Sequence, residues 1–141
     1  MSISDILRYK GADVVTIAPG ETVTALLHSL AEHNIGALVV LDAGRVVGIV
    51  SERDVVRRIA ERGAAQLDAP VEEIMTSVVA TCTPKDSVDS VAETMTERRI
   101  RHMPVLDAGR LLGIVSIGDV VSSRMRQLEK DRGQLEHYIS G

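Results

Sequence analysis

Apolar residues in the first half of the chain recur with the spacing of one helix and two strands. The helical spacing is that of a single apolar face, formed by Val23, Leu26, Leu27 and Leu30. Apolar runs of strand length follow at 37–41 and 46–50, and the sequence Asp-Ala-Gly-Arg at 42–45 predicts a tight hairpin turn between them. With a short apolar segment at 14–17 and a helix that begins at Ser51, this half predicts the order β-α-β-β-α.

The same pattern returns in the second half of the chain. Asp-Ala-Gly-Arg recurs unchanged at 107–110, and Gly-Ile-Val-Ser, present at 48–51, recurs at 113–116. The helical face recurs as Val88, Val91, Ala92 and Met95. Apolar segments at 79–82 and 102–106 supply the matching strands. We therefore predict a mixed α/β fold, in which two β-α-β-β-α repeats pack about a pseudo-twofold axis and bring equivalent loops to one cleft.

The boundaries of the repeats follow from this comparison. We predict a first repeat over 1–62, a linker over 63–70, a second repeat over 71–125 and a helical tail over 126–141. A weaker similarity precedes the two copies, since residues 3–7 (Ile-x-x-Ile-Leu) resemble residues 71–75 (Val-x-x-Ile-Met). This similarity makes 3–7 the beginning of the first repeat, followed by a longer loop around residues 10–12.

The tail is charged and helical in character. Its apolar residues are spaced almost as in a coiled-coil seam, which consists of Val121, Met125, Leu128, Leu135 and Ile139 and is interrupted by Arg132. Two interpretations remain: the tail folds back on its own repeat, or the seam is a contact in a homodimer. We expect a homodimer.

Composition narrows the class of protein. The net charge is −4, and the short basic runs at 57–58 and 98–102 are too few for an extended nucleic-acid surface. The single cysteine, Cys82, excludes an internal disulfide, and no apolar run is long enough to span a bilayer. We therefore expect a cytoplasmic protein that binds neither nucleic acid nor membranes.

The sequence carries no pattern typical of catalysis or of metal binding. His28 and His33 are five positions apart and would not share a helix face, and the chain has no paired cysteines and no Gly-rich phosphate loop. Cys82 lies in an apolar segment, where a cysteine is more often a small buried hydrophobe than a nucleophile. We expect a protein that is not an enzyme and holds no metal.

Candidate chemistry lies in the repeated heptad Gly-Ile-Val-Ser-x-x-Asp, found at 48–54 and 113–119. Its Ser and Asp fall at the start of a helix, where free N–H groups favour an anion, and an ionised Asp can accept hydrogen bonds from both hydroxyls of a ribose. The same pattern is also a capping box, in which the two side chains bind backbone N–H groups. Because the heptad recurs in both copies we favour a ligand-binding role, and the two roles are compatible.

These heptads, together with Arg-His-Met-Pro-Val at 101–105, resemble the CBS domain family, and the paired copies resemble its tandem form, the Bateman module. The resemblance covers residues 3–125 and is closest to stand-alone bacterial-type CBS proteins. It implies that the heptad Ser and Asp contact the phosphate or ribose of an adenosine ligand, while the base lies against the first strand and the segment before the hairpin. The corresponding residues are Thr81, Arg101, His102, Met103, Pro104, Ser116, Gly118 and Asp119 in the second repeat, and Thr16, Ala37, Leu38, Ser51, Arg53 and Asp54 in the first.

The two half-sites are not equivalent in sequence. The second repeat has Arg101 and His102 where the first has Gly and Ala, and the first has Arg53 where the second has Gly118. We therefore expect the second repeat to be the tighter adenosine site, with Arg53 and Arg57 as candidates to reach phosphates across the cleft.

The resemblance implies a regulatory module that senses AMP, ADP or ATP and acts on a separate, unidentified protein. An NAD(H) ligand is an alternative, because Asp54 and Asp119 could each hold one ribose, and S-adenosylmethionine is another. A different class of function is a constitutive dimerisation scaffold, in which the heptads are only helix caps. A weaker third alternative is nucleic-acid binding through the short basic runs.

Overall fold

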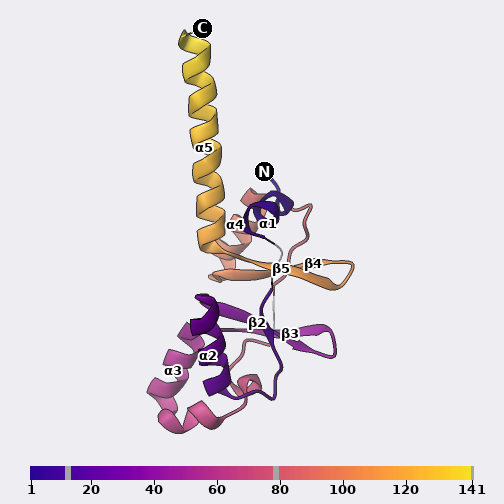
Figure 1. The fold of residues 1–141 in the computed structure, drawn as a ribbon, viewed down its shortest axis with the longest axis vertical. Helices are drawn as coiled ribbons and strands as arrows, with labels where there is room; N and C mark the ends of the chain where they lie inside the picture. The colour runs from indigo at the N-terminus through magenta and orange to yellow at the C-terminus, as the bar shows by residue number, and fades with distance from the viewer. Residues whose placement is uncertain (12–13, 78–79, 141) are drawn as a thin grey trace. The chain divides into compact units, whose positions relative to one another are not determined.

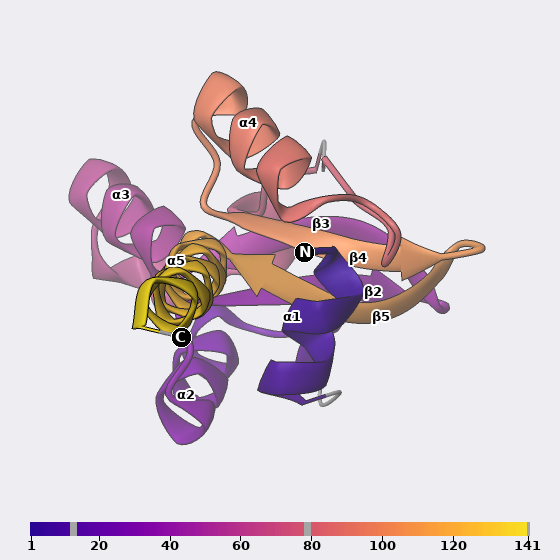
Figure 2. The ribbon, with the colours of Figure 1, turned by 90° about the horizontal axis from the view of Figure 1, so that it is seen from above.

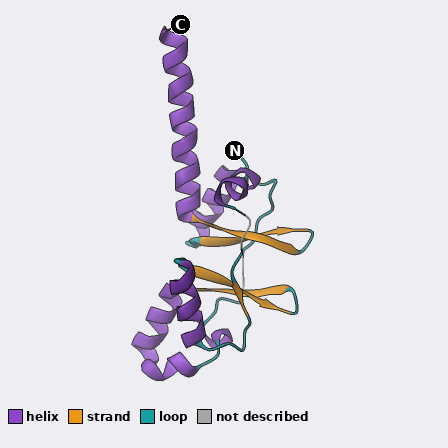
Figure 3. Ribbon diagram, viewed as in Figure 1, coloured by secondary structure: helices purple, strands orange, loops and turns teal. Residues whose placement is uncertain are grey.

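The structure is a computed structural model that describes residues 1–11, 14–77 and 80–140. The chain forms two compact units, each with helices and strands (Figures 1 and 3). One unit comprises Met1–Ala12, Thr81–Asp107 and Leu112–Gly141, and the other comprises Asp13–Ala80 and Ala108–Leu111. The predicted mixed α/β fold with two repeats of helices and strands is confirmed.

The first repeat forms a three-stranded sheet with two helices. Its elements are β1 (Thr16–Ile17), α2 (Val23–His33), β2 (Ala37–Asp42), β3 (Arg45–Ser51) and α3 (Glu52–Arg62). The sheet order is β1-β2-β3, in which β1 runs parallel and β3 antiparallel to β2. Helices α2 and α3 lie on one face of this sheet (Figure 1). Two short 3-10 helices, η1 (Ala64–Asp68) and η2 (Val71–Glu73), follow α3.

The predicted hairpin turn is confirmed in the first repeat. Only Ala43 and Gly44 separate β2 from β3, and their φ angles are 51° and 78°. Positive φ at both central residues is the mark of a two-residue type I′ turn, whose twist matches that of the strands it joins. Ala108 and Gly109 repeat these angles, at 51° and 80°, between β4 (His102–Asp107) and β5 (Arg110–Ser116).

The second repeat pairs β4 with β5 and adds three helices. These are α4 (Val88–Arg98), α5 (Ile117–Ser140) and, from the N-terminus of the chain, α1 (Ile3–Lys10), which lies over the β4–β5 pair in Figures 1 and 2. The predicted segment 79–82 begins at residue 79, which lies outside the described residues. Its last residue, Cys82, forms an isolated parallel bridge with Val105, in the place that β1 takes in the first repeat.

The core of each unit includes a short segment that is not one of the β-α-β-β-α elements of its repeat. Val71 and Ile74, which follow the predicted linker, are buried in one cluster with the apolar face of α2. Ile3 and Ile6 of α1 are 0% and 2% exposed in the unit that contains the second repeat. The similar segments 3–7 and 71–75 therefore both contribute buried apolar side chains to a core, and α1 does so in the unit that contains the second repeat.

Helix α5 is continuous from Ile117 to Ser140, so no break separates the second repeat from the predicted tail. Its apolar seam residues are each at least half exposed: Val121, Met125, Leu128, Leu135 and Ile139. The tail therefore does not fold back on its own repeat, and the seam stays exposed to solvent among the residues that the structure describes.

Candidate functional site

The heptad of the second repeat forms the turn from β5 into α5. The Ser116 N–H donates to Asp119 Oδ2 at 2.8 Å, and the Ser116 hydroxyl oxygen accepts from the Asp119 N–H at 3.1 Å. These reciprocal bonds are a capping box, which satisfies backbone donors that a helix start leaves free. Both side chains are thereby held at the first turn of α5.

The heptad of the first repeat forms the same capping box. The Ser51 N–H donates to Asp54 Oδ2 at 2.8 Å, the Ser51 hydroxyl donates to the same oxygen at 3.0 Å, and the Asp54 N–H donates to Ser51 Oγ at 3.3 Å. The capping interpretation of the heptad is therefore confirmed in both repeats. It leaves the ligand-binding interpretation open, because the two bonds that the Asp54 carboxylate accepts here both fall on Oδ2.

A lysine that sequence analysis did not select completes the heptad of the second repeat. Lys10, the last residue of α1, donates from Nζ to Asp119 Oδ2 at 2.7 Å and to the backbone carbonyl of Ile114 at 2.8 Å. In the first repeat, the carbonyl of Ile49 accepts instead from the backbone N–H of Thr76 at 2.9 Å. Lys10 therefore adds a positive charge, and no described residue forms a matching ion pair with Asp54 at the first heptad.

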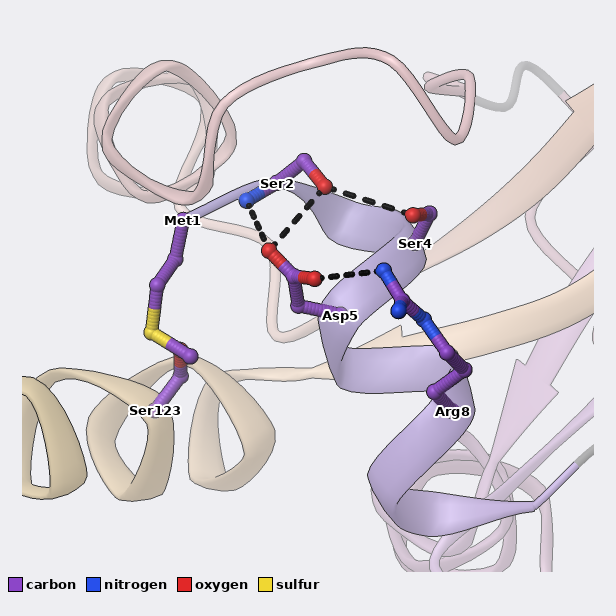
Figure 4. A network of polar contacts seen from close by, with 6 residues as sticks. All are labelled: Met1, Ser2, Ser4, Asp5, Arg8 and Ser123. Atoms are coloured by element: carbon purple, nitrogen blue, oxygen red, sulfur yellow. Dashed lines mark hydrogen bonds and ion pairs between the residues drawn. The ribbon is translucent and has the colours of Figure 1, made fainter.

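Helix α1 is fixed to the second repeat by contacts near its N-terminus (Figure 4). Within the α1 segment, the Ser2 N–H donates to Asp5 Oδ2 at 2.9 Å and Arg8 forms an ion pair with Asp5 at 2.7 Å. A contact with the second repeat is made by the Ser123 hydroxyl of α5, which donates to Met1 Sδ at 3.3 Å. The backbone N–H of Ile3 also donates to the carbonyl of residue 86, at 2.9 Å. These contacts orient the helix that carries Lys10.

The surroundings of Asp119 keep its carboxylate ionised. Its side chain is 23% exposed, and this burial by itself raises its pKa. The hydrogen bond from Lys10, the backbone N–H of Ser116 and the charge of Lys10 together outweigh burial, so the pKa of Asp119 lies below its ordinary value of 3.8. A negative charge at this position is therefore stable at neutral pH.

A pocket of about 310 Å³ opens beside the Lys10–Asp119 ion pair. It is lined by residues of α1 and α5, namely Ile6, Tyr9, Lys10, Asp119, Ser122 and Arg126. The guanidinium carbon of Arg126 stands 3.8 Å from the centre of the Tyr9 ring, a cation–π contact. We call this hollow the α1–α5 pocket. Its volume is at the low end of the range of roughly 300–1,000 Å³ for small-molecule sites.

The family follows from a match to the whole tandem repeat. The model of the CBS domain matches residues 3–61 and again residues 71–126. The chain belongs to the CBS domain family. The resemblance drawn from the two heptads is thereby confirmed.

Similar proteins extend this assignment. CBSX3, a mitochondrial CBS domain-containing protein of Arabidopsis thaliana, is 35% identical over 149 residues, which cover 99% of this chain and 72% of CBSX3. The crystal structure of the CBS-domain protein ATU1752 from Agrobacterium tumefaciens is 46% identical with a TM-score of 0.85, and the match covers 88% of this chain and 99% of that one. The CBS pair of MJ0100, solved with 5′-methylthioadenosine and S-adenosyl-L-methionine, is 30% identical with a TM-score of 0.79, covering 92% and 98%.

The predicted residues of the second repeat of this CBS protein divide into two groups. Ser116, Gly118 and Asp119 lie at the turn into α5, and the Arg101 carbonyl joins them because it accepts from the Ile117 N–H at 2.8 Å. The other group lies along β4 and the bridge before α4: Thr81, His102, Met103 and Pro104. Met103 is only 1% exposed and Pro104 is buried, so their side chains belong to the core of the unit.

The predicted residues of the first repeat divide in the same way. Ser51 and Asp54 meet in the capping box, and the exposed Arg53 stands between them in sequence. Thr16 pairs with Val39 in the parallel β1–β2 ladder. Ala37 and Leu38, which share β2, are 4% and 0% exposed, so these side chains also belong to the core. Ligand contact by any of these residues stays a prediction.

Sequence analysis missed four polar or aromatic residues of the α1–α5 pocket: Tyr9, Lys10, Ser122 and Arg126. The signal available was the likeness of 3–7 to 71–75, which does not say which repeat each segment joins. Among the described residues, no cluster of three His, Cys, Asp or Glu side chains could hold a metal ion. Within the same residues, no helix has the length and apolar character needed to cross a membrane.

Proposed function

We propose that this CBS protein is a ligand-binding regulatory module without catalytic activity, and that its second repeat binds an adenine nucleotide through Asp119 and Ser116. The observation that carries the proposal is the state of the Asp119 carboxylate. Oδ2 is held by the Ser116 N–H and by Lys10, whereas Oδ1 has no partner among the described residues. An ionised oxygen in this state can accept a strong hydrogen bond from a ribose hydroxyl.

The remaining predicted residues have supporting roles in this proposal. Arg101 and His102 supply groups near the phosphate and base, and Gly118 leaves the first turn of α5 open to a ligand. A Cβ atom placed on Gly118 would meet nothing closer than the Ser116 hydroxyl, at 3.6 Å. The CBS pair of MJ0100 was solved with two adenosine-containing ligands, and this similarity supports an adenosine ligand for the present protein. AMP, ADP and ATP are our first choice, and NAD(H) and S-adenosylmethionine are the alternatives.

Isothermal titration calorimetry tests this function. AMP, ATP, NADH and S-adenosylmethionine are titrated into the wild type and into the Asp119→Ala and Asp54→Ala variants. We expect saturable binding to the wild type, and a loss of roughly ten-fold or more in affinity for Asp119→Ala, because a charged acceptor of ribose hydroxyls is removed. Asp54→Ala is the matched control, since it removes the same group from the first repeat and should have the smaller effect. Failure of every adenosine compound to bind at up to low millimolar concentration contradicts the proposal.

Regulation in this proposal is exerted on a separate protein by a CBS homodimer whose arrangement responds to the ligand. A constitutive dimerisation scaffold is the second candidate, and the exposed seam of α5 favours it. Sedimentation velocity with and without AMP separates the two candidates, because a scaffold should dimerise equally in both. The Leu128→Gln/Leu135→Gln variant tests whether the apolar seam of α5 forms the dimer contact. If the variant still dimerises, the seam is not that contact.

A further inference from the structure

The α1–α5 pocket has an excess of positive charge. Lys10 and Arg126 contribute two cations, and Asp119 contributes the only carboxylate among the residues that line it. Lys10 already neutralises Asp119 at a distance of 2.7 Å, so the charge of Arg126 has no counterpart. An anionic group that enters the pocket would therefore meet net attraction, although a carboxylate lies in its wall.

Arg126 is held in place without an acidic partner. Its guanidinium carbon lies 3.8 Å from the centre of the Tyr9 ring, and none of the ion pairs among the described residues involves it. Stacking on an aromatic face leaves the N–H groups at the edge of the guanidinium plane available as donors. A guanidinium held in this way suits the oxygens of a phosphate, which accept two parallel hydrogen bonds.

Donors for a phosphate and an acceptor for a hydroxyl therefore line the same hollow. The Ser122 hydroxyl and the third N–H of the Lys10 ammonium have no acceptor among the described residues, and Asp119 Oδ1 has no donor. A simple inorganic anion would leave the acceptor unused. A phosphorylated ribose presents a hydroxyl as well as a phosphate and can use both.

We propose that the α1–α5 pocket binds the phosphate of the nucleotide, through Lys10, Arg126 and Ser122, while Asp119 accepts a ribose hydroxyl. This inference rests on the proposed function and narrows its ligand class to phosphorylated nucleosides. S-adenosylmethionine has a net positive charge and no phosphate, so it lacks the group that Lys10, Arg126 and Ser122 would bind. Tyr9 has a positioning role, since it holds Arg126.

The test compares AMP with adenosine, which differ only in the phosphate. Both are titrated calorimetrically into the wild type and the Lys10→Gln, Arg126→Gln and Arg132→Gln variants. We expect AMP to bind the wild type at least roughly ten-fold more tightly than adenosine, since charge-assisted hydrogen bonds to a phosphate are strong. Arg126→Gln and Lys10→Gln should each reduce this preference several-fold. Arg132→Gln removes an equal charge from the same helix as Arg126, outside the pocket, and should leave the preference unchanged.

Tyrosine fluorescence provides a second readout that leaves the pocket intact. The chain has no Trp and only two Tyr, so Tyr138→Phe leaves Tyr9 as the only source of tyrosine emission. AMP should change the emission of Tyr9 because the phosphate draws Arg126 away from its ring, whereas adenosine should change it little. Inorganic phosphate is the third titrant, and we expect it to bind more weakly than AMP.

The outcomes separate this inference from the function on which it rests. Equal affinity for adenosine and AMP, or an AMP preference that persists in the Lys10→Gln/Arg126→Gln variant, overturns the phosphate pocket and leaves adenosine binding intact. Inorganic phosphate that binds as tightly as AMP also overturns it, because the ribose then contributes nothing. If neither nucleoside nor nucleotide binds the wild type, both proposals fail together.

Discussion

The two repeats share a heptad and differ in what covers it. Both heptads form the same Ser–Asp capping box, with one N–H···Oδ2 bond of 2.8 Å in each. The backbone of Thr76 bonds to Ile49 in the first repeat, whereas the side chain of Lys10 reaches the second heptad from α1. The residues that are identical in the two heptads therefore form the same helix start. The segment that packs beside each heptad differs, and only α1 brings a lysine to it.

The largest expected difference between the repeats concerns the glycine that begins each heptad. A Cβ placed on Gly48 would lie 2.6 Å from Met75 Sδ and 2.9 Å from the carbonyl oxygen of Thr76, whereas one on Gly113 would lie 2.8 Å from a terminal methyl group of Leu7. A backbone carbonyl cannot move aside as a side-chain end can. We expect Gly48→Ala to lower the free energy of unfolding by roughly 2–3 kcal/mol and Gly113→Ala by about 1 kcal/mol.

Urea denaturation of the two variants measures this difference. Gly118→Ala is the control, because its nearest neighbour would be 3.6 Å away and alanine is the better helix former. It should unfold at the same urea concentration as the wild type or at a higher one. Equal losses of unfolding free energy for Gly48→Ala and Gly113→Ala would contradict this expectation. They would mean that the Thr76 carbonyl and the Leu7 side chain make room for a methyl group equally well.

We expect the Lys10–Asp119 ion pair to make the stability of the protein depend on pH. Because the pKa of Asp119 in the folded protein lies below 3.8, the folded state binds fewer protons than the unfolded state as pH falls. The stabilisation is therefore fully present above pH 3.8 and is lost as pH falls through the lowered pKa. At pH 7 we expect Asp119→Asn to cost about 1 kcal/mol, since the pair is partly exposed to solvent.

Unfolding in urea at several pH values tests this dependence. The difference in stability between the wild type and Asp119→Asn should be constant from neutral pH to about pH 5 and should shrink below the ordinary pKa of 3.8. Asp54→Asn should cost less at pH 7, because no ion pair among the described residues involves Asp54. If the stability difference between the wild type and Asp119→Asn grows on acidification, the Asp119 carboxylate does not stabilise the folded state through its charge.

Removal of the capping hydroxyls should affect the two repeats alike. Ser51 and Ser116 each accept from the N–H of the heptad Asp, at 3.3 and 3.1 Å. We expect Ser51→Ala and Ser116→Ala each to cost about 1 kcal/mol in urea denaturation, with partial rescue by Thr. A marked inequality would show that the two boxes are not equivalent, in spite of their matching geometry.

Local patterns were sufficient to predict most of the fold. The hairpin turns, the apolar face of α2 and the helix starts at Ser51 and Ser116 depend on residues a few positions apart, which is why sequence analysis found them. The capping box was predicted for the same reason. Each of these features is decided by the backbone and by neighbours within one turn.

The position of α1 could not be read from the same patterns. The likeness of 3–7 to 71–75 indicates that both segments bury similar side chains, but it does not say with which repeat each segment packs in space. Lys10 and Asp119 are 109 positions apart, so no local signal joins them. The α1–α5 pocket depends on that single long-range placement, and for this reason the sequence pointed to the Asp and missed its lysine.

The smallest expected effect concerns Cys82, which occupies the place of Ile17 in the first repeat. Cys82 is 4% exposed, and burial, with a smaller effect from Asp86, raises the pKa of its thiol to about 12. A thiol in this state is almost entirely protonated at pH 8 and should not react with iodoacetamide until urea unfolds the chain. Because Cys82 packs as a small apolar residue, Cys82→Val should change stability by less than about 1 kcal/mol. Lys85→Cys in the Cys82→Val background provides an exposed thiol that should react at once, and equally fast reaction of native Cys82 would contradict its burial.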